Sequence, residues 1–195
     1  MPKLLIRALA LCLTVAVAAC VPAQKEQPRA PAAPTYPVVG GATMYPNYTI
    51  FQNLQNSNDH KTLVAAITAA GAGPRLSGEH GYTLFAPTDA AFRLLPHGTI
   101  EALMHPRSRQ ELAGVVGAHI VPGAKSRSDI MADVQAGGGH ASYRTAQGGN
   151  LRVTMEAGRI VVTDPNGRRS TVAQADIASA NGVFHVTEAV LLPSG

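Results

Sequence analysis

The segment Tyr82–Phe92 constrains the fold more than any other part of the sequence, because it encodes a strand, a corner and a helix start in one short run. It begins with apolar and β-branched residues that predict a strand. Pro87 cannot donate to a continuing strand ladder, and Thr88 or Asp89 can cap the helix that follows. Two aromatic rings are expected to be buried around this corner, those of Phe85 and Phe92. The segment is explained by structure alone and requires no catalytic group.

Hydrophobic periodicity predicts helices before the strand-rich second half of the chain. Apolar residues lie one helical turn apart in three places, at Ile50, Phe51 and Leu54, at Leu63, Val64 and Ile67, and at Leu112, Val115, Val116 and Ile120. We expect Thr62 or Asp59 to cap the second helix and Ser108 to cap the third. Pro122–Gly123 is expected to end the third helix.

The second half of the chain alternates apolar and polar residues, which predicts strands. Leu151–Glu156 and Arg159–Thr163 form a predicted hairpin, followed by an apolar stretch at Thr171–Ile177. Asn181 and Gly182 then open a last predicted strand, Val183–Leu192. Helices in one half and strands in the other predict an α+β domain, in which a helical layer covers a sheet.

The N-terminus is typical of an export signal. Lys3 and Arg7 precede an apolar run, Ala8–Ala19, that is shorter than the about 20 residues of a membrane-spanning helix. We therefore predict a signal peptide at residues 1–19. Cys20 follows small residues, as in bacterial lipoprotein signals, and this similarity implies acylation of Cys20; the alternative is an ordinary cleavage site with an incidental cysteine. Two or more acyl chains anchor a protein stably in a membrane.

Residues 20–37 are predicted to form a tether, because prolines recur there too closely for helix or sheet. At about 3.1 Å per residue in the polyproline conformation, this tether reaches roughly 50 Å. The folded domain is then residues 38–195. Because Cys12 is removed with the signal, a lipidated Cys20 leaves no free thiol, which excludes disulfides and cysteine chemistry.

The charge distribution argues against a nucleic-acid partner. The chain has a net charge of +4, but beyond His60 it has 12 basic residues against 10 acidic ones. The basic doublets in this part have no interleaved aromatic residues and are typical of a solvated surface.

The sequence resembles a known family. Tyr82–Phe92 is similar to the first signature box of fasciclin domains, Asn181–Pro193 to the second, and Ala118–Gly123 to the central segment between them. The resemblance runs from about Val38 to Pro193 and includes features of a secreted bacterial branch. It implies a wedge of two β-sheets with helices packed at one side. Ala118 replaces the tyrosine of the central segment, so the integrin recognition associated with that segment in some animal relatives is not implied.

The candidate site residues are interpreted first as structural. They are the motif residues Phe85, Pro87, Thr88, Phe92, His119, Asn181, Gly182 and His185, together with the lipid attachment site Cys20. His119 and His185 lie among apolar residues and can bind a metal or ligand, although such histidines more often bond to backbone. Asp129 and Asp133 are either an acid/base pair or part of a solvated helix face, and the second is the default. We expect no catalytic residue, no metal site and no cofactor.

These observations favour a non-catalytic module for adhesion or for interaction with an envelope or extracellular protein or polysaccharide. We expect it to be exported and held by the lipid on Cys20, at the outer membrane, facing the periplasm or the cell surface. The alternative is a periplasmic small-molecule binding or enzyme-assisting domain.

Overall fold

The computed structural model describes residues 35–76 and 81–193 of the chain. The predicted signal peptide, Cys20 and almost all of the tether lie outside these residues. Chain contacts separate Met1–Pro34 from Thr35–Gly195, and the second unit holds every element described below. None of the helices in the described ranges is long and apolar enough to cross a membrane.

Seven strands form one sheet in the order β4-β3-β9-β8-β7-β6-β5. Their bounds are β3 (Tyr82–Pro87), β4 (Ile120–Pro122), β5 (His140–Arg144), β6 (Asn150–Glu156), β7 (Arg159–Thr163), β8 (Arg169–Ser179) and β9 (Gly182–Thr187). β3 and β9 run parallel, and the other neighbours run antiparallel. A two-stranded hairpin, β1 (Val38–Val39) and β2 (Ala42–Thr43), lies apart from this sheet.

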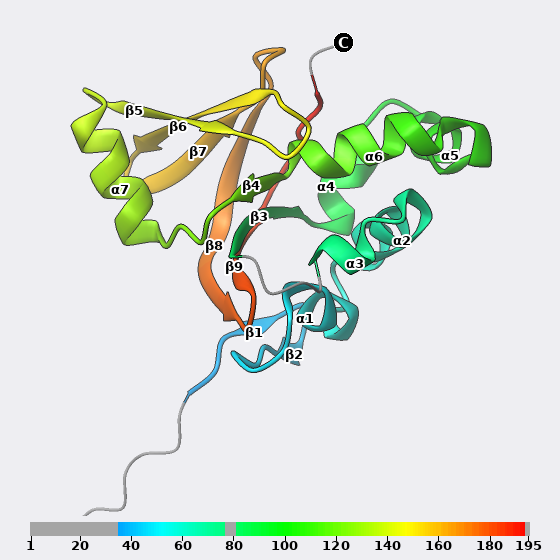
Figure 1. Ribbon diagram of the computed structural model, residues 1–195, viewed down its shortest axis with the longest axis horizontal. Coiled ribbons are helices and arrows are strands. Elements are labelled where there is room, and N and C mark those ends of the chain that lie inside the picture. The colour runs from blue at the N-terminus through cyan, green and yellow to red at the C-terminus, as the bar shows by residue number, and fades with distance from the viewer. Residues whose placement is uncertain (1–34, 77–80, 194–195) are drawn as a thin grey trace, which may run out of the picture. The chain divides into compact units, whose positions relative to one another are not determined.

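The long strand β8 joins the two halves of the predicted wedge. It pairs with β9 on one edge and with β7 on the other, and its register shifts twice between Val172 and Ile177. The half formed by β3, β4 and β9 and the half formed by β5, β6 and β7 therefore diverge from a shared strand (Figure 1). The predicted α+β wedge is confirmed, and so is the hairpin of β6 and β7.

Most helices gather beside the half of the sheet that contains β3 (Figure 1). They are α1 (Ile50–Asn56), α2 (Lys61–Ala70), α3 (Gly73–Leu76), α4 (Asp89–Arg93), α5 (Thr99–Met104), the short 3-10 helix η1 (Pro106–Ser108) and α6 (Arg109–Ala118). The remaining helix, α7 (Arg127–Ala136), packs against β5 and β6.

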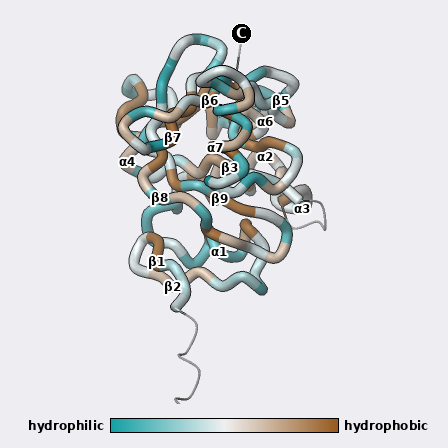
Figure 2. Tube along the Cα trace, turned by 90° about the vertical axis from the view of Figure 1, so that its left-hand side faces the viewer, coloured by the Kyte–Doolittle hydropathy of each residue, from teal (hydrophilic) through white to brown (hydrophobic). Residues whose placement is uncertain are grey.

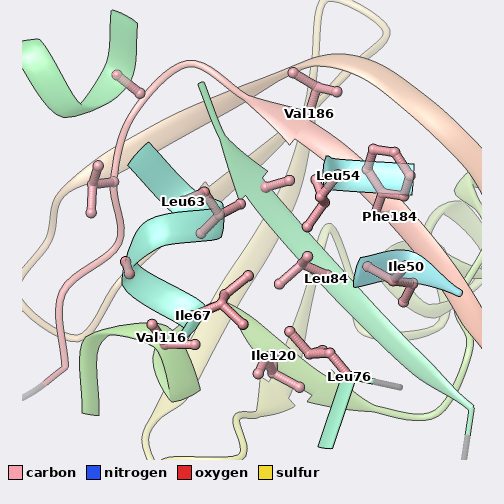
Figure 3. Packing of buried hydrophobic residues seen from close by; sticks show 14 of the residues in the cluster. Ile50, Leu54, Leu63, Ile67, Leu76, Leu84, Val116, Ile120, Phe184 and Val186 are labelled. Atoms are coloured by element: carbon pink, nitrogen blue, oxygen red, sulfur yellow. The ribbon is translucent and has the colours of Figure 1, made fainter. Parts of the chain in front are cut away.

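Strand β3 separates two hydrophobic clusters. Leu84 faces the helices, where it packs in one cluster with side chains such as Ile67 and Phe184 (Figure 3). Phe85, the next residue, points to the opposite face and belongs to the cluster beneath β5, β6 and β7. The predicted burial of Phe85 and Phe92 is confirmed, but the two rings lie in different clusters because Phe92 is in helix α4. In Figure 2 hydrophobic segments are concentrated in the interior strands and helices.

Two predicted element ends were wrong. Helix α6 ends at Ala118 rather than at Pro122, because the chain turns at His119 and Ile120–Pro122 becomes β4, paired with the start of β3. The last strand ends at Thr187 rather than at Leu192. Beyond it, side chains replace strand pairing, since the backbone N–H of Leu192 donates to the Asp164 carboxylate at 2.9 Å.

Neither of two predicted side-chain caps forms. Helix α2 begins after His60, and its first N–H groups are satisfied from another segment: Asp89 accepts hydrogen bonds from the N–H groups of Lys61 and Thr62. Ser108 occupies the predicted N-cap position of α6, but its side chain makes no cap hydrogen bond. It is also the last residue of η1, which runs directly into α6.

Candidate binding surface

At the corner after β3, Pro87 ends the strand and Thr88 caps helix α4, as their residue types predict. The side chain of Thr88 accepts a hydrogen bond from the N–H of Ala91 at 3.2 Å and so caps α4. Pro87 is the last residue of β3 and lies opposite Thr187 at the end of β9. This leaves the carboxylate of Asp89 free to cap α2, which locks the corner to a second helix.

His119 ties the end of α6 to the C-terminal segment. Its side chain is 1% exposed, its Nε2 accepts a hydrogen bond from the N–H of Leu191 at 2.9 Å, and its Nδ1 lies 2.8 Å from the Val115 carbonyl. Because an N–H group must donate to Nε2, the proton of the neutral ring is on Nδ1, which donates to Val115. Burial lowers the pKa of His119 from 6.5 to about 4.

His185 connects β9 to an irregular part of β8 and to the loop before α7. Its Nε2 donates to the Lys125 carbonyl at 2.9 Å, and its Nδ1 accepts from the N–H of Asp176 at 3.2 Å. Asp176 has a positive φ of 63°, and its carboxylate accepts from the N–H of Arg127 at the start of α7. The ring also stacks on Phe85 at a centroid distance of 5.7 Å, and burial lowers its pKa.

Asn181 and Gly182 fix the start of β9. The buried side-chain oxygen of Asn181 accepts from the N–H of Ile50, and its amide donates to the Leu76 carbonyl, so that two helices are held to the strand. Gly182 passes so close to Tyr82 that a Cβ atom would lie 2.0 Å from the Tyr82 carbonyl oxygen. Only glycine fits this position.

A third buried histidine lies at the start of α2. His60 is 0% exposed, and its Nδ1 is 2.8 Å from the hydroxyl of Ser57. Its Nε2 has no hydrogen-bond partner of ordinary geometry, although the nearby Ala86 carbonyl opposes the lowering of its pKa by burial. Like His119 and His185, it is therefore neutral near pH 7.

Asp129 and Asp133 do not form an acid/base pair. Asp129 shares a capping box with Ser126 at the start of α7, and these hydrogen bonds lower its pKa. Asp133 accepts hydrogen bonds from Lys125 at 2.8 Å and from Tyr143 at 2.7 Å, which lower its pKa as well. Both carboxylates are ionised and serve the local structure.

The motif side chains bond mainly to backbone groups, so their chemistry is structural. Across residues 35–76 and 81–193 no group of three or more His, Cys, Asp or Glu residues is arranged to hold a metal ion. The feature best suited to a partner is an open groove of about 840 Å³ between α5, η1, α6 and the C-terminal segment. Its lining mixes apolar and charged side chains and includes Ala102, Leu103, Arg107, Glu111, Gln147 and Leu192.

The groove was not predicted from the sequence. One wall is the segment that His119 holds through Leu191, and Gly114 and Gly117 of α6 make room for Gln147 near the other side. A Cβ atom at either glycine would approach Gln147 to 3.3 Å. Two glycines three residues apart inside an amphipathic helix were the one local signal of this close approach.

Comparison with known proteins places this arrangement in a family. The sequence profile of the fasciclin domain matches residues 58–193. The chain belongs to the fasciclin domain family. Protein sll1483 of Synechocystis sp. is 35% identical over 156 residues, which cover 80% of this chain and 79% of that protein. Transforming growth factor-beta-induced protein ig-h3 of Sus scrofa is 34% identical over 148 residues, which cover 76% of this chain but 20% of that protein.

A solved structure supports the same fold. A FAS1 domain pair from the insect cell adhesion molecule fasciclin I superposes with a TM-score of 0.68 at 20% identity, covering 75% of this chain and 51% of that one. In this fasciclin domain the three sequence motifs form neighbouring strands, since the first box supplies β3, the second supplies β9 and the central segment supplies β4. The motifs therefore supply three adjoining strands at one edge of the sheet.

Proposed function

We propose that this chain is a lipid-anchored adhesion module of a bacterial cell envelope, which binds an envelope or extracellular protein or polysaccharide through the groove between α5 and α6. The groove carries the proposal, because it is open and combines apolar surface with opposite charges, Arg107 and Glu111. Contact surfaces of this mixed character suit weak, repeated contacts with a large partner. The solved domain pair of the same fold comes from a cell adhesion molecule.

The anchor is part of the same proposal. Acylation of Cys20 and a tether over residues 20–37 place many copies of the domain at one membrane, where weak contacts act together. A role without chemistry agrees with the site, because His119 and His185 bond to backbone groups. The hydroxyl of Ser57 does lie 2.8 Å from His60, but both residues are buried, so this pair is closed to a substrate.

A blocking substitution in the groove tests this function. Ala102 is exposed on α5, and Ala102→Arg fills the groove with a long charged side chain. Ala132→Arg on α7 is the matched control, since it makes the same change on an exposed helical site away from the groove. Beads carrying each lipidated form are tested for retention on isolated envelope and matrix fractions.

We expect the unaltered protein and Ala132→Arg to be retained and Ala102→Arg to be lost. Equal retention of all three would show that the groove is not the binding surface. If no form is retained on any fraction while the protein turns over a defined metabolite, the adhesion function is wrong. The small-molecule alternative then replaces it, and the groove has a volume typical of such sites.

A further inference from the structure

Three tyrosine rings pack against one another where the chain enters the domain, and two of them are exposed. The rings of Tyr36 and Tyr45 lie 5.4 Å apart, and those of Tyr45 and Tyr48 lie 5.2 Å apart. Tyr45 and Tyr48 are 37% and 38% exposed, Tyr36 is half-buried, and Val38, two residues after Tyr36, is 56% exposed. We call Tyr36, Val38, Tyr45 and Tyr48 the tyrosine platform.

Buried polar contacts hold the platform in place. Asn53, which is 0% exposed, accepts a hydrogen bond from the N–H of Tyr45 and donates to the Tyr45 carbonyl, both at 2.9 Å. The same side chain donates to the hydroxyl of Ser179 at the end of β8. The carbonyl of Tyr48 accepts from the N–H of Ala180 at 2.8 Å. The rings of Tyr45 and Tyr48 are therefore presented by a rigid turn, which reduces the entropy lost when they bind.

The segment that forms the platform has no charge. From Thr35 to Asn58 the sequence contains no Asp, Glu, Lys, Arg or His. Tyrosine combines an apolar ring with a polar hydroxyl and is enriched where proteins meet the membrane–water interface. A neutral surface of this kind needs no anionic lipid and suits an interface of any headgroup composition.

The platform and the groove lie at opposite ends of the described unit. Asn181 bonds to the start of α1, and Ala180 bonds to Tyr48. Because β9 begins at the next residue and pairs in parallel with the start of β3, both strands start at the platform end. Helix α4 follows the other end of β3. Figures 1 and 2 show β1, β2 and α1 at one end, with α6 towards the other.

We propose that the tyrosine platform docks onto the lipid–water interface of the membrane to which the chain is tethered. This proposal rests on the anchoring part of the proposed function, because a tether that starts at Cys20 brings the chain into the domain directly beside Tyr36. Tethering raises the effective concentration of the platform at its own membrane, so weak intrinsic binding is sufficient. Docking turns the groove away from the membrane, towards a partner.

Tryptophan fluorescence can report this docking, because the chain contains no tryptophan. Tyr48→Trp places an indole in the platform, and Leu94→Trp places one at the exposed end of α4, where the side chain is 74% exposed. Each chain, from residue 21 onward with an N-terminal hexahistidine tag, is held on zwitterionic vesicles containing nickel-chelating lipid and brominated phosphatidylcholine. Brominated acyl chains quench only an indole that reaches the bilayer.

We expect quenching of the Tyr48→Trp indole and none of the Leu94→Trp indole. Adding Val38→Asp to Tyr48→Trp should remove the quenching, because a carboxylate at the platform resists transfer into the interface. Met131→Asp, a charge on the exposed face of α7, should leave the quenching unchanged. An unchanged thermal transition in Val38→Asp shows that the domain remains folded.

Absence of quenching at Tyr48→Trp overturns the proposal. It is also overturned if the emission of Tyr48→Trp responds to isolated envelope polysaccharide and not to brominated lipid, since the platform is then a saccharide site. The nickel-chelating lipid replaces the acyl anchor, so these results do not depend on lipidation of Cys20. Mass spectrometry of the mature N-terminus tests that part of the proposed function separately.

Discussion

Acidification should weaken the fold chiefly through its buried histidines, and His119 allows the effect to be worked out. The neutral ring accepts the N–H of Leu191 at Nε2 and donates to Val115 at Nδ1. Protonation places a hydrogen on Nε2, which removes the acceptor of the Leu191 N–H and leaves a charge in a side chain that is 1% exposed. The folded state therefore resists protonation more than the unfolded state does.

The size of the effect follows from the pKa. His119 has a pKa of about 4 when folded, against 6.5 for an ordinary histidine. Because the pKa of His119 is lower in the folded than in the unfolded state, the stability that the neutral ring contributes is present above pH 6.5. It is lost as the pH falls towards 4. At 1.36 kcal/mol per pKa unit, His119 alone lowers the free energy of unfolding by about 2.5 kcal/mol at pH 4.5. That is a large share of the about 5–15 kcal/mol that stabilises a typical domain.

Urea unfolding of the unaltered protein and of His119→Gln, at pH 7.5 and pH 4.5, measures this contribution. Burial also lowers the pKa values of His60 and His185, so their protonation at low pH should destabilise both proteins as well. Between pH 7.5 and pH 4.5, the unaltered protein should lose about 2.5 kcal/mol more of its free energy of unfolding than His119→Gln does. This difference corresponds to roughly 1 M in the urea midpoint. Equal losses in the two proteins would refute the assignment of this pH dependence to His119.

Three further substitutions test the anchor, the core and the pairing of β3 with β9. Cys20→Ala should move the protein from the membrane fraction to the soluble or precursor pool, and unlipidated Cys20 in the mature protein would contradict the lipid anchor. Phe85→Ala should lower the free energy of unfolding by roughly 3–5 kcal/mol, because it removes a fully buried ring; an unchanged melting temperature would contradict that burial. Gly182→Ala should cost at least about 2 kcal/mol, since the new Cβ meets the Tyr82 carbonyl. Gly123→Ala, at a positive φ but in open space, is the control and should cost only about 1 kcal/mol.

Features encoded within a few residues were predictable from the sequence. The corner at Pro87 and the cap at Thr88 depend on neighbouring residues alone, and the hairpin at Ala157–Gly158 depends on a local turn. Caps supplied from a distance were not predictable. Asp89 was considered as a cap of the helix that it begins, α4. It caps α2 instead, because the fold brings together two segments that are about thirty residues apart in sequence.

The ends of two elements were predicted wrongly for a related reason. Ile120 continues the apolar spacing of α6, but the chance to pair with β3 outweighs helix propensity after His119. The groove was missed because its walls come from α5, α6, the loop at Gln147 and the C-terminal segment, and no single stretch of sequence contains it. The tyrosine platform is contained in one stretch, but only the folded turn brings its rings together.

The parallel pairing of β3 and β9 has a mechanical consequence for an adhesion protein. Both strands run from the end where the chain enters towards the end that carries the groove. In the proposed anchored state, tension between the membrane and a bound partner would act along the strands, and the backbone hydrogen bonds between them would be sheared together rather than opened one after another. We expect the domain to withstand a pull in this direction better than a pull across the sheet.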